Sequence, residues 1–178
     1  MTQNNRPVVL VFAGNDPTGG AGIQADIETL ASLGCHPAPV VTALTVQDTV
    51  GVKHYMPVEA GMVIAQARAV LEDMPVAAFK AGMLGSAENA TALAAIMQDY
   101  PDIPLILDPI LTSGRGDPLA DDSLADALQS LLIPQATLVT PNTLEVMQLA
   151  PDADNIDSAA QELLSTGCTF VLVTGTHE

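Results

Sequence analysis

The stretch that decides the fold reads Val8-Val-Leu-Val-Phe-Ala13, followed by Gly14-Asn-Asp-Pro-Thr-Gly-Gly-Ala-Gly22. Its first six residues form an unbroken apolar run, which is typical of a strand buried on both faces of a parallel sheet. A glycine-rich loop comes next, and a helical pattern then extends to about Leu33, just before Gly34. A buried strand, a loop and a helix in this order indicate the start of an α/β domain.

The same alternation continues along the chain. We expect further strands at 40–42, 76–81, 105–107, 138–140 and 170–173, and helices at 57–72, 86–99, 122–132, from 142 onward and at 158–165. This order predicts one α/β domain over residues 1–178, with a largely parallel sheet and helices on both faces. The last expected strand ends five residues before Glu178, so we also expect the domain to be C-terminally incomplete.

Composition excludes several classes of protein. Hydrophobic residues make up 48% of the 178 residues, enough for a sizeable core. There is neither an apolar run long enough to span a membrane nor a secretory leader, so we expect a cytoplasmic protein. The net charge of −16 excludes nucleic acid and anionic membrane surfaces as partners. Cys35 and Cys168 stand apart and are expected to be reduced thiols.

Polar residues directly follow the expected strands. Because parallel α/β sheets bind ligands at the carboxyl ends of their strands, these residues are the first candidates for a site. They are Asn15, Asp16, Gln47, Asp48, Asp108, Asn142 and Thr174.

The glycine loop matches two phosphate-binding patterns only in part. Gly14 and Gly19 have P-loop spacing, but Gly20-Ala21 stands where that motif requires Lys followed by Ser or Thr, which excludes it. The segment Gly20-x-Gly22-x-x-Ala25 fits a dinucleotide fingerprint, although no acid near Thr42 is available to hold a ribose. A dinucleotide-dependent oxidoreductase is therefore the weaker alternative.

Five segments in order resemble the hydroxymethylpyrimidine/phosphomethylpyrimidine kinases, a family within the ribokinase-like superfamily. The first is the loop itself, extended from Ala13 to Asp26, and the resemblance covers essentially the whole chain. The other four are Thr42-Ala-Leu-Thr-Val-Gln-Asp-Thr-Val-Gly51, Lys80-Ala-Gly-Met-Leu84, Leu107-Asp-Pro-Ile110 and Thr140-Pro-Asn-Thr-Leu-Glu145.

The resemblance implies a ribokinase-like fold and a kinase that uses ATP and Mg²⁺. Its substrates would be 4-amino-5-hydroxymethyl-2-methylpyrimidine and the corresponding monophosphate, in thiamine biosynthesis. The residues implied around the pyrimidine are Gly14, Asp26, Gln47, Met83 and Ile110. An amide at position 47 suits an aminopyrimidine edge, which offers both a donor and ring-nitrogen acceptors.

The same resemblance implies residues for the nucleotide and the metal. Asn142 and Thr174 would contact the nucleotide phosphates, and Asp108 and Glu145 would hold the metal. Asn142 followed by Glu145 also has the spacing of a helix N-cap and its capping box, so a structural role is equally compatible with the sequence.

The sequence departs from the family pattern at two points. Thr174 occupies the place of a lysine, and no Gly-x-Gly-Cys segment, the family's catalytic anion hole, occurs after Gly34. We therefore assign no catalytic residue to this chain and expect that hole beyond Glu178. Two alternatives stay open: a truncated, non-catalytic pyrimidine-binding chain and a pyridoxal-type vitamin kinase. A homodimer also stays open, and Arg115 is either a phosphate contact or a surface residue.

Overall fold

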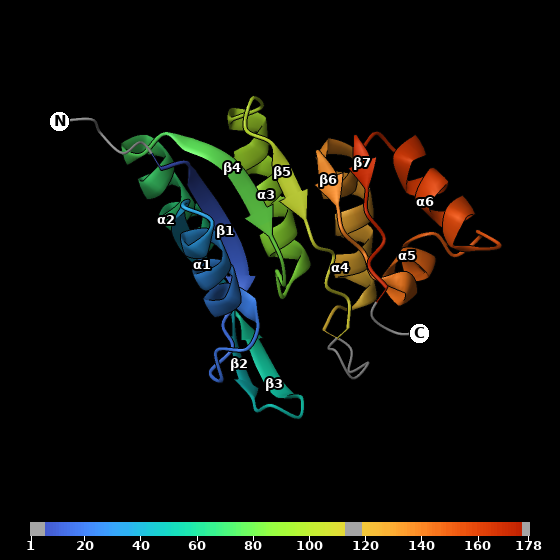
Figure 1. The fold of residues 1–178 in the computed structure, drawn as a ribbon, viewed down its shortest axis with the longest axis horizontal. Helices are drawn as coiled ribbons and strands as arrows, with labels where there is room; N and C mark the ends of the chain where they lie inside the picture. The colour runs from blue at the N-terminus through green and yellow to red at the C-terminus, as the bar shows by residue number, and fades with distance from the viewer. Residues whose placement is uncertain (1–5, 113–118, 176–178) are drawn as a thin grey trace.

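The protein is built around one seven-stranded sheet, seen in a computed structural model that describes residues 6–112 and 119–175 (Figure 1). The strand order is β3-β2-β1-β4-β5-β6-β7, and every neighbouring pair is parallel except β2 with β3. The strands are β1 (Val8–Gly14), β2 (His36–Gln47), β3 (Val52–Pro57), β4 (Val76–Ala81), β5 (Leu105–Leu107), β6 (Leu138–Val139) and β7 (Phe170–Val171). The expected α/β architecture is confirmed.

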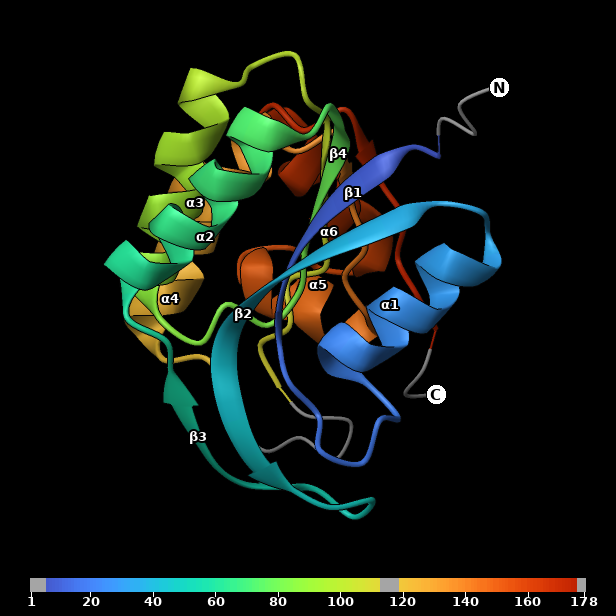
Figure 2. The same cartoon turned by 90° about the vertical axis from the view of Figure 1, so that its left-hand side faces the viewer.

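Helices cover the two faces of the sheet unequally (Figure 2). Among the helices of residues 6–112 and 119–175, only α1 lies on one face, and the others pack together on the opposite face. The helices are α1 (Gly22–Ser32), α2 (Ala60–Asp73), α3 (Ala87–Asp99), α4 (Asp122–Ala127), α5 (Thr143–Leu149) and α6 (Ile156–Ser165). In the part of the chain that the structure describes, no helix is both long and apolar enough to cross a membrane.

Strand β1 is buried along its whole length, as its apolar run predicts. Leu10 and Phe12 point into the larger core beneath α2 and α3, whereas Val9 and Val11 pack under α1. Phe12 meets Phe79 of β4 edge to face, with ring centroids 6.2 Å apart. Truncation of either ring to alanine would cost about 3–5 kcal/mol in the free energy of unfolding.

A hairpin is the main feature that the sequence patterns do not predict. The sequence patterns predict a short strand at 40–42 and a helix that begins at Pro57. In the structure, β2 extends to Gln47, β3 returns antiparallel and ends at Pro57, and α2 begins at Ala60. The turn is fixed by Asp48, whose Oδ1 accepts hydrogen bonds from two backbone N–H groups. The hairpin extends beyond the ends of the other strands of the sheet (Figure 2). Leu44 and Val46 are exposed there, so the apolar residues of the hairpin do not follow the pattern of a buried strand.

Other element boundaries also differ from expectation, two of them near the candidate site or its supporting helices. The helix expected over 122–132 is α-helical only to Ala127 and continues as a π-helical turn over Leu128–Leu132. Strand β7 ends at Val171 rather than Val173, although Leu172 and Thr174 still donate backbone hydrogen bonds to the neighbouring β6 segment. This continued bonding brings Thr174 to the same edge as the end of β6.

Candidate functional site

The candidate site lies along the carboxyl edge of the sheet. Strands β1, β4, β5 and β6 end there side by side, as parallel order requires. The residues singled out from the sequence lie at this edge, on the hairpin beyond it or in the helices that begin at it: Gly14, Asp26, Gln47, Met83, Asp108, Ile110, Asn142, Glu145 and Thr174.

The glycine loop after β1 is organised by Asp16, which is only 4% exposed. Its carboxylate accepts hydrogen bonds from the Thr18 backbone N–H at 2.8 Å, the Thr18 hydroxyl at 2.9 Å and the Ala21 N–H at 2.9 Å. Burial alone would raise the pKa of Asp16, but hydrogen bonds from Gln47, Thr18 and Ala21 outweigh burial and lower it. Asp16 is therefore an anion that holds the loop.

Gln47, at the end of β2, faces this anion. Its side chain is one of the groups that lower the pKa of Asp16, so the far part of the hairpin lies beside the glycine loop. Asn15 adds a second link, because its Oδ1 accepts from the Thr45 N–H at 2.8 Å and its carbonyl accepts from the Thr45 hydroxyl at 2.8 Å. Gln47, the amide expected to bind the pyrimidine, thus also lies beside Asp16, a neighbour that the spacing of the sequence motifs did not reveal.

Lys80, which the sequence analysis did not select, pairs with one carboxylate of the site and acts electrostatically on a second. Lys80 is the last residue but one of strand β4, and its Nζ atom lies 3.0 Å from Oδ2 of Asp26. Both side chains are about four-fifths buried. Burial raises the pKa of Asp108; the Lys80 charge opposes this rise and the Asp26 charge adds to it. The three groups form one charge cluster at the ends of β4 and β5.

Gly82 makes room for the Lys80 ammonium. A Cβ at this position would lie 2.8 Å from Lys80 Nζ and 3.6 Å from Cδ1 of Ile110. The available signal in the sequence was the motif Lys80-Ala-Gly-Met-Leu84, in which one of only five basic residues stands at the carboxyl end of an apolar strand. Such a lysine would not be placed there without a partner.

Apolar side chains from three segments meet beside the charge cluster. Met83 and Ala43 are buried in one small cluster, against which Ile110 packs together with Val52 and Tyr55 of the hairpin. Gly14 belongs to this contact, since a Cβ there would lie 3.2 Å from Sδ of Met83. The structure therefore brings Gly14, Met83 and Ile110 together and adds residues of β3 that the sequence analysis missed.

Asn142 and Glu145 form a complete capping box at the start of α5. Asn142 Oδ1 accepts from the backbone N–H groups of Leu144 and Glu145, and Glu145 Oε2 accepts from the Asn142 N–H, each at 2.9 Å. The other carboxylate oxygen of Glu145 accepts from the Leu111 N–H at 3.3 Å. The structural alternative raised by the sequence is thus present, and Glu145 also ties α5 to the segment after Asp108.

Thr174 lies beside Asn142, with which it forms an isolated parallel bridge. These two residues stand at the β6–β7 half of the edge, whereas Gln47 stands at the β1–β2 half. The predicted nucleotide contacts therefore lie at one end of the edge, whereas the predicted pyrimidine contacts extend from Gln47 at the other end to the segments after β4 and β5. Arg115 lies outside the described residues.

Oxygen ligands for a magnesium ion are unevenly available. No described residue donates a hydrogen bond to the Asp108 carboxylate, while both oxygens of Glu145 already accept backbone N–H groups. Among the described residues, no cluster of three His, Cys, Asp or Glu side chains is placed to hold a metal. The arrangement fits an ion that keeps several waters and takes few protein carboxylates, as Mg²⁺ does.

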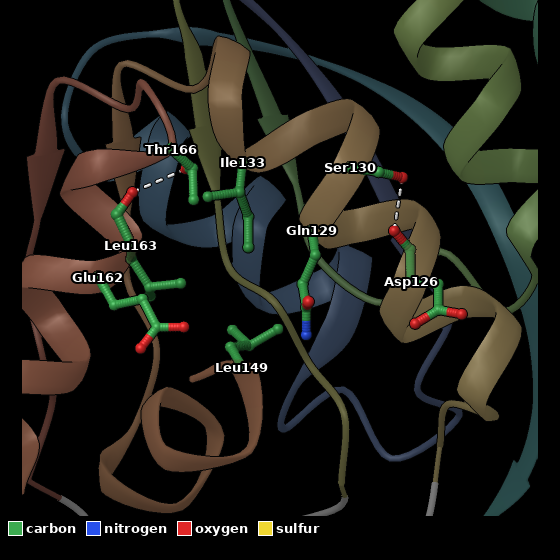
Figure 3. A pocket seen from close by; sticks show the side chains of 8 residues that line it. All are labelled: Asp126, Gln129, Ser130, Ile133, Leu149, Glu162, Leu163 and Thr166. Atoms are coloured by element: carbon green, nitrogen blue, oxygen red, sulfur yellow. Dashed lines mark hydrogen bonds between the residues drawn. The ribbon is translucent and has the colours of Figure 1, made fainter. Parts of the chain in front are cut away.

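A separate pocket of about 380 Å³ lies among α4, α5 and α6, away from the residues just described (Figure 3). Its floor is apolar, formed by Ile133, Leu149 and Leu163. Its hydroxyl groups are bonded within their own helical segments, because Ser130 donates to the Asp126 carbonyl and Thr166 to the Leu163 carbonyl. The pocket contains none of the predicted site residues.

The fold and this edge define a class: an α/β protein with a small-molecule site at the ends of its parallel strands. A sequence model of the family described as "Phosphomethylpyrimidine kinase" matches residues 16–178, and the chain belongs to that family. The Mycobacterium tuberculosis (strain H37Rv) hydroxymethylpyrimidine/phosphomethylpyrimidine kinase is 44% identical over 176 residues, which cover 96% of this chain. The Escherichia coli K12 protein of the same name is 39% identical over 94% of this chain. The chain spans 64% and 65% of these two relatives.

Solved structures agree with the family. The chain is similar to a phosphomethylpyrimidine kinase from Clostridium difficile 630, with a TM-score of 0.88 and 34% identity, covering 97% of this chain and 76% of that one. It is also similar to a Bacillus subtilis pyridoxal kinase in complex with ADP, with a TM-score of 0.83 and 26% identity, covering 96% of this chain and 65% of that one. The ribokinase-like resemblance noted from the sequence is confirmed at the level of family and fold.

Proposed function

We propose that this chain is part of a kinase that transfers the γ-phosphoryl group of ATP to 4-amino-5-hydroxymethyl-2-methylpyrimidine and then to its monophosphate, in thiamine biosynthesis. The observation that carries the proposal is the meeting of Asp26, Lys80 and Asp108 beside the apolar contact of Met83 with Gly14. Family membership supports the same chemistry. The site offers what an aminopyrimidine requires: an apolar surface for the ring and acceptors for its amino group.

In this proposal, Met83 and Ile110 pack against the pyrimidine ring, and Asp26 accepts a hydrogen bond from its amino group. Gln47, which lies beside Asp16, presents its amide to the ring edge. The hydroxymethyl oxygen then points along the edge toward Asn142 and Thr174, where the nucleotide phosphates bind. In the first transfer, the hydroxymethyl oxygen attacks the γ-phosphorus in line with the departing ADP oxygen, and its proton passes to a base that is not assigned to this chain. In the second transfer, a phosphate oxygen of the monophosphate attacks instead.

Asp108 is the residue proposed to hold Mg²⁺ directly, and Glu145 assists through a water because its oxygens already accept backbone hydrogen bonds. When bound, the ion neutralises charge on the phosphate oxygens. Lys80 keeps the cluster of Asp26 and Asp108 from carrying two uncompensated negative charges. No catalytic anion hole is assigned to residues of this chain.

The remaining features of the proposal concern the state of the protein. We propose that residues 1–178 act as one ribokinase-like domain unit, that the protein works in the cytoplasm and that it forms a homodimer. Gel filtration with light scattering would test the last point. A mass near 18.4 kDa would contradict the dimer.

A pyridoxal-type kinase is the second candidate, favoured by the structural likeness to pyridoxal kinases. A substrate comparison separates the two: the purified full-length protein is incubated with [γ-³²P]ATP and Mg²⁺, with either the hydroxymethylpyrimidine or pyridoxal as acceptor. Labelled pyrimidine supports the proposal, and labelled pyridoxal alone contradicts it. Pyrimidine binding without turnover would instead support the non-catalytic alternative.

A further inference from the structure

Asn89 is a fully buried polar residue that belongs to neither the charge cluster nor the apolar contact. It lies in the first turn of α3, and its exposed fraction is 0%. Its Nδ2 atom lies 2.9 Å from the Leu84 carbonyl oxygen, 3.1 Å from that of Thr42 and 3.1 Å from that of Val58. One side chain therefore joins three backbone segments that are distant in sequence.

The chemistry of the amide fixes its orientation. All three neighbours are carbonyl acceptors, so the nitrogen with its two hydrogens must face them and share one hydrogen between two oxygens. Oδ1 is consequently buried with no hydrogen-bond partner among the described residues. An apolar residue would spare this one oxygen but would withdraw the donor from three carbonyls, so the amide is the better solution.

The three carbonyls mark the foot of the β2–β3 hairpin and the loop that carries Met83. Thr42 immediately precedes Ala43, the last residue of β2 that pairs with β1, and Val58 immediately follows β3. Leu84 is the residue after Met83, and the Thr42 hydroxyl donates to the Met83 carbonyl. Figure 2 shows the hairpin leaving the sheet close to the start of α3.

We propose that Asn89 is a positioning residue that anchors the hairpin to the Met83 loop and thereby sets the spacing of the apolar side chains against which the pyrimidine is proposed to pack. Met83 on the loop and Val52 and Tyr55 on the hairpin share one apolar cluster, so a change in the angle between the two segments changes that cluster. The identity of the ligand rests on the proposed function above. The anchoring itself does not depend on it.

The test compares Asn89→Ala with Thr42→Val, which removes the hydroxyl bond to Met83 and leaves the amide in place. Ile96→Val is the matched control, because Ile96 is a fully buried residue of the same helix and is not among the partners of Asn89. Two quantities are measured on the whole chain: amide hydrogen exchange of residues 44–57 and the dissociation constant of 4-amino-5-hydroxymethyl-2-methylpyrimidine by calorimetry.

We expect Asn89→Ala to accelerate exchange in the hairpin about tenfold or more relative to the rest of the sheet, because the hairpin loses its anchor. The dissociation constant should rise by about the same factor. Thr42→Val should change both quantities in the same direction by less, and this milder variant decides the outcome if Asn89→Ala does not fold. Ile96→Val should accelerate exchange uniformly and leave the affinity unchanged.

Uniform acceleration in the Asn89 variant, with no excess in the hairpin, would overturn the anchoring role. Faster hydrogen exchange confined to the hairpin, with an unchanged dissociation constant of the pyrimidine, would overturn the link between this anchor and pyrimidine binding. Failure of the unaltered chain to bind the pyrimidine would count against the proposed function instead, and hydrogen exchange would still decide whether Asn89 anchors the hairpin.

Discussion

Nζ of Lys80 lies 3.0 Å from Oδ2 of Asp26, at the point where strand β4 ends. The ammonium group lies next to Gly82, where a Cβ would be 2.8 Å from Nζ. In a chain with 21 acidic and 5 basic residues, this places one of few cations beside a carboxylate of the candidate site. The ion pair orients Asp26 toward β4, and the Lys80 charge also opposes the rise in the pKa of Asp108. We therefore expect the binding of a pyrimidine at Asp26 to depend on this contact.

Removal of the Lys80 ammonium should lower both the stability of the protein and its affinity for the pyrimidine. In Lys80→Met, Asp26 and Asp108 lose their shared counter-charge, and we expect the free energy of unfolding to fall by about 1–3 kcal/mol. The pyrimidine affinity should fall as well, because Asp26 is no longer oriented. Urea denaturation and calorimetry measure the two effects. The control is Lys53→Met, which breaks the exposed pair with Asp48 and should cost less than about 1 kcal/mol. Equal losses in the two variants would contradict the account.

Gly82→Ala should disturb the same contact sterically. The new Cβ would lie 2.8 Å from Lys80 Nζ, so the ammonium must move away from Asp26. Because a flexible lysine end can move cheaply, we expect a small loss of stability and a clear loss of pyrimidine affinity. Gly20→Ala is the matched control, since its nearest neighbours would be 3.5 and 3.7 Å away. The interpretation fails if Gly82→Ala binds as tightly as the unaltered chain.

Gly22 is required for backbone geometry rather than for the charge cluster. It has a φ of +58°, and a Cβ there would lie 2.4 Å from the Gly14 carbonyl oxygen. Both the conformation and the close approach of α1 to β1 exclude a side chain, so Gly22→Ala should lower the free energy of unfolding by about 2–4 kcal/mol. Thermal denaturation measures this loss, and a melting temperature equal to that of Gly20→Ala would refute it.

Two capping boxes in the chain allow a paired test of Asn142. Asn142 caps α5 and Asn155 caps α6, each with the reciprocal side-chain bond present. Replacement of either by alanine should cost about 1 kcal/mol. Only Asn142→Ala should also weaken binding of a non-hydrolysable ATP analogue, because only Asn142 stands at the carboxyl edge beside Thr174. Parallel loss of nucleotide affinity in both variants would show that Asn142 acts only as a cap.

Asp108 should lower the stability of the folded protein at neutral pH and at the same time be needed for Mg²⁺-dependent nucleotide binding. Burial raises its pKa, so the ionised carboxyl is disfavoured in the folded state and reduces stability as the pH rises from the ordinary pKa of 3.8 through the folded-state pKa. Asp108→Asn should therefore be more stable than the unaltered chain at pH 7, and the difference should vanish below about pH 4. A variant less stable at pH 7 would contradict this sign. Mg²⁺-dependent nucleotide binding should be lost in the same variant.

The sequence was sufficient for the layers of the fold and for the edge at which the site lies. The buried strand β1 and the polar residues after each strand can be recognised from patterns within short segments. These patterns do not depend on contacts between distant parts of the chain. The β2–β3 hairpin could not be predicted in this way, because Leu44 and Val46 are exposed and their apolar character does not report burial.

The partners within the site could not be predicted either. Whether Lys80 meets Asp26, or Gln47 meets Asp16, depends on how far β4 and β2 extend past their neighbours. No residue pattern within one segment encodes that distance. Asn89 is a further case, since an asparagine in the first turn of a helix is ordinarily exposed, and only the packed structure surrounds it with carbonyls.

The central claim is that the carboxyl edge between β2 and β5 binds an aminopyrimidine alcohol. Isothermal titration of the 178-residue chain with 4-amino-5-hydroxymethyl-2-methylpyrimidine, run beside pyridoxal, tests it most directly. We predict one binding site for the pyrimidine, tighter than for pyridoxal and weakened in Lys80→Met. No heat of binding at saturating pyrimidine, or tighter binding of pyridoxal, would contradict the claim.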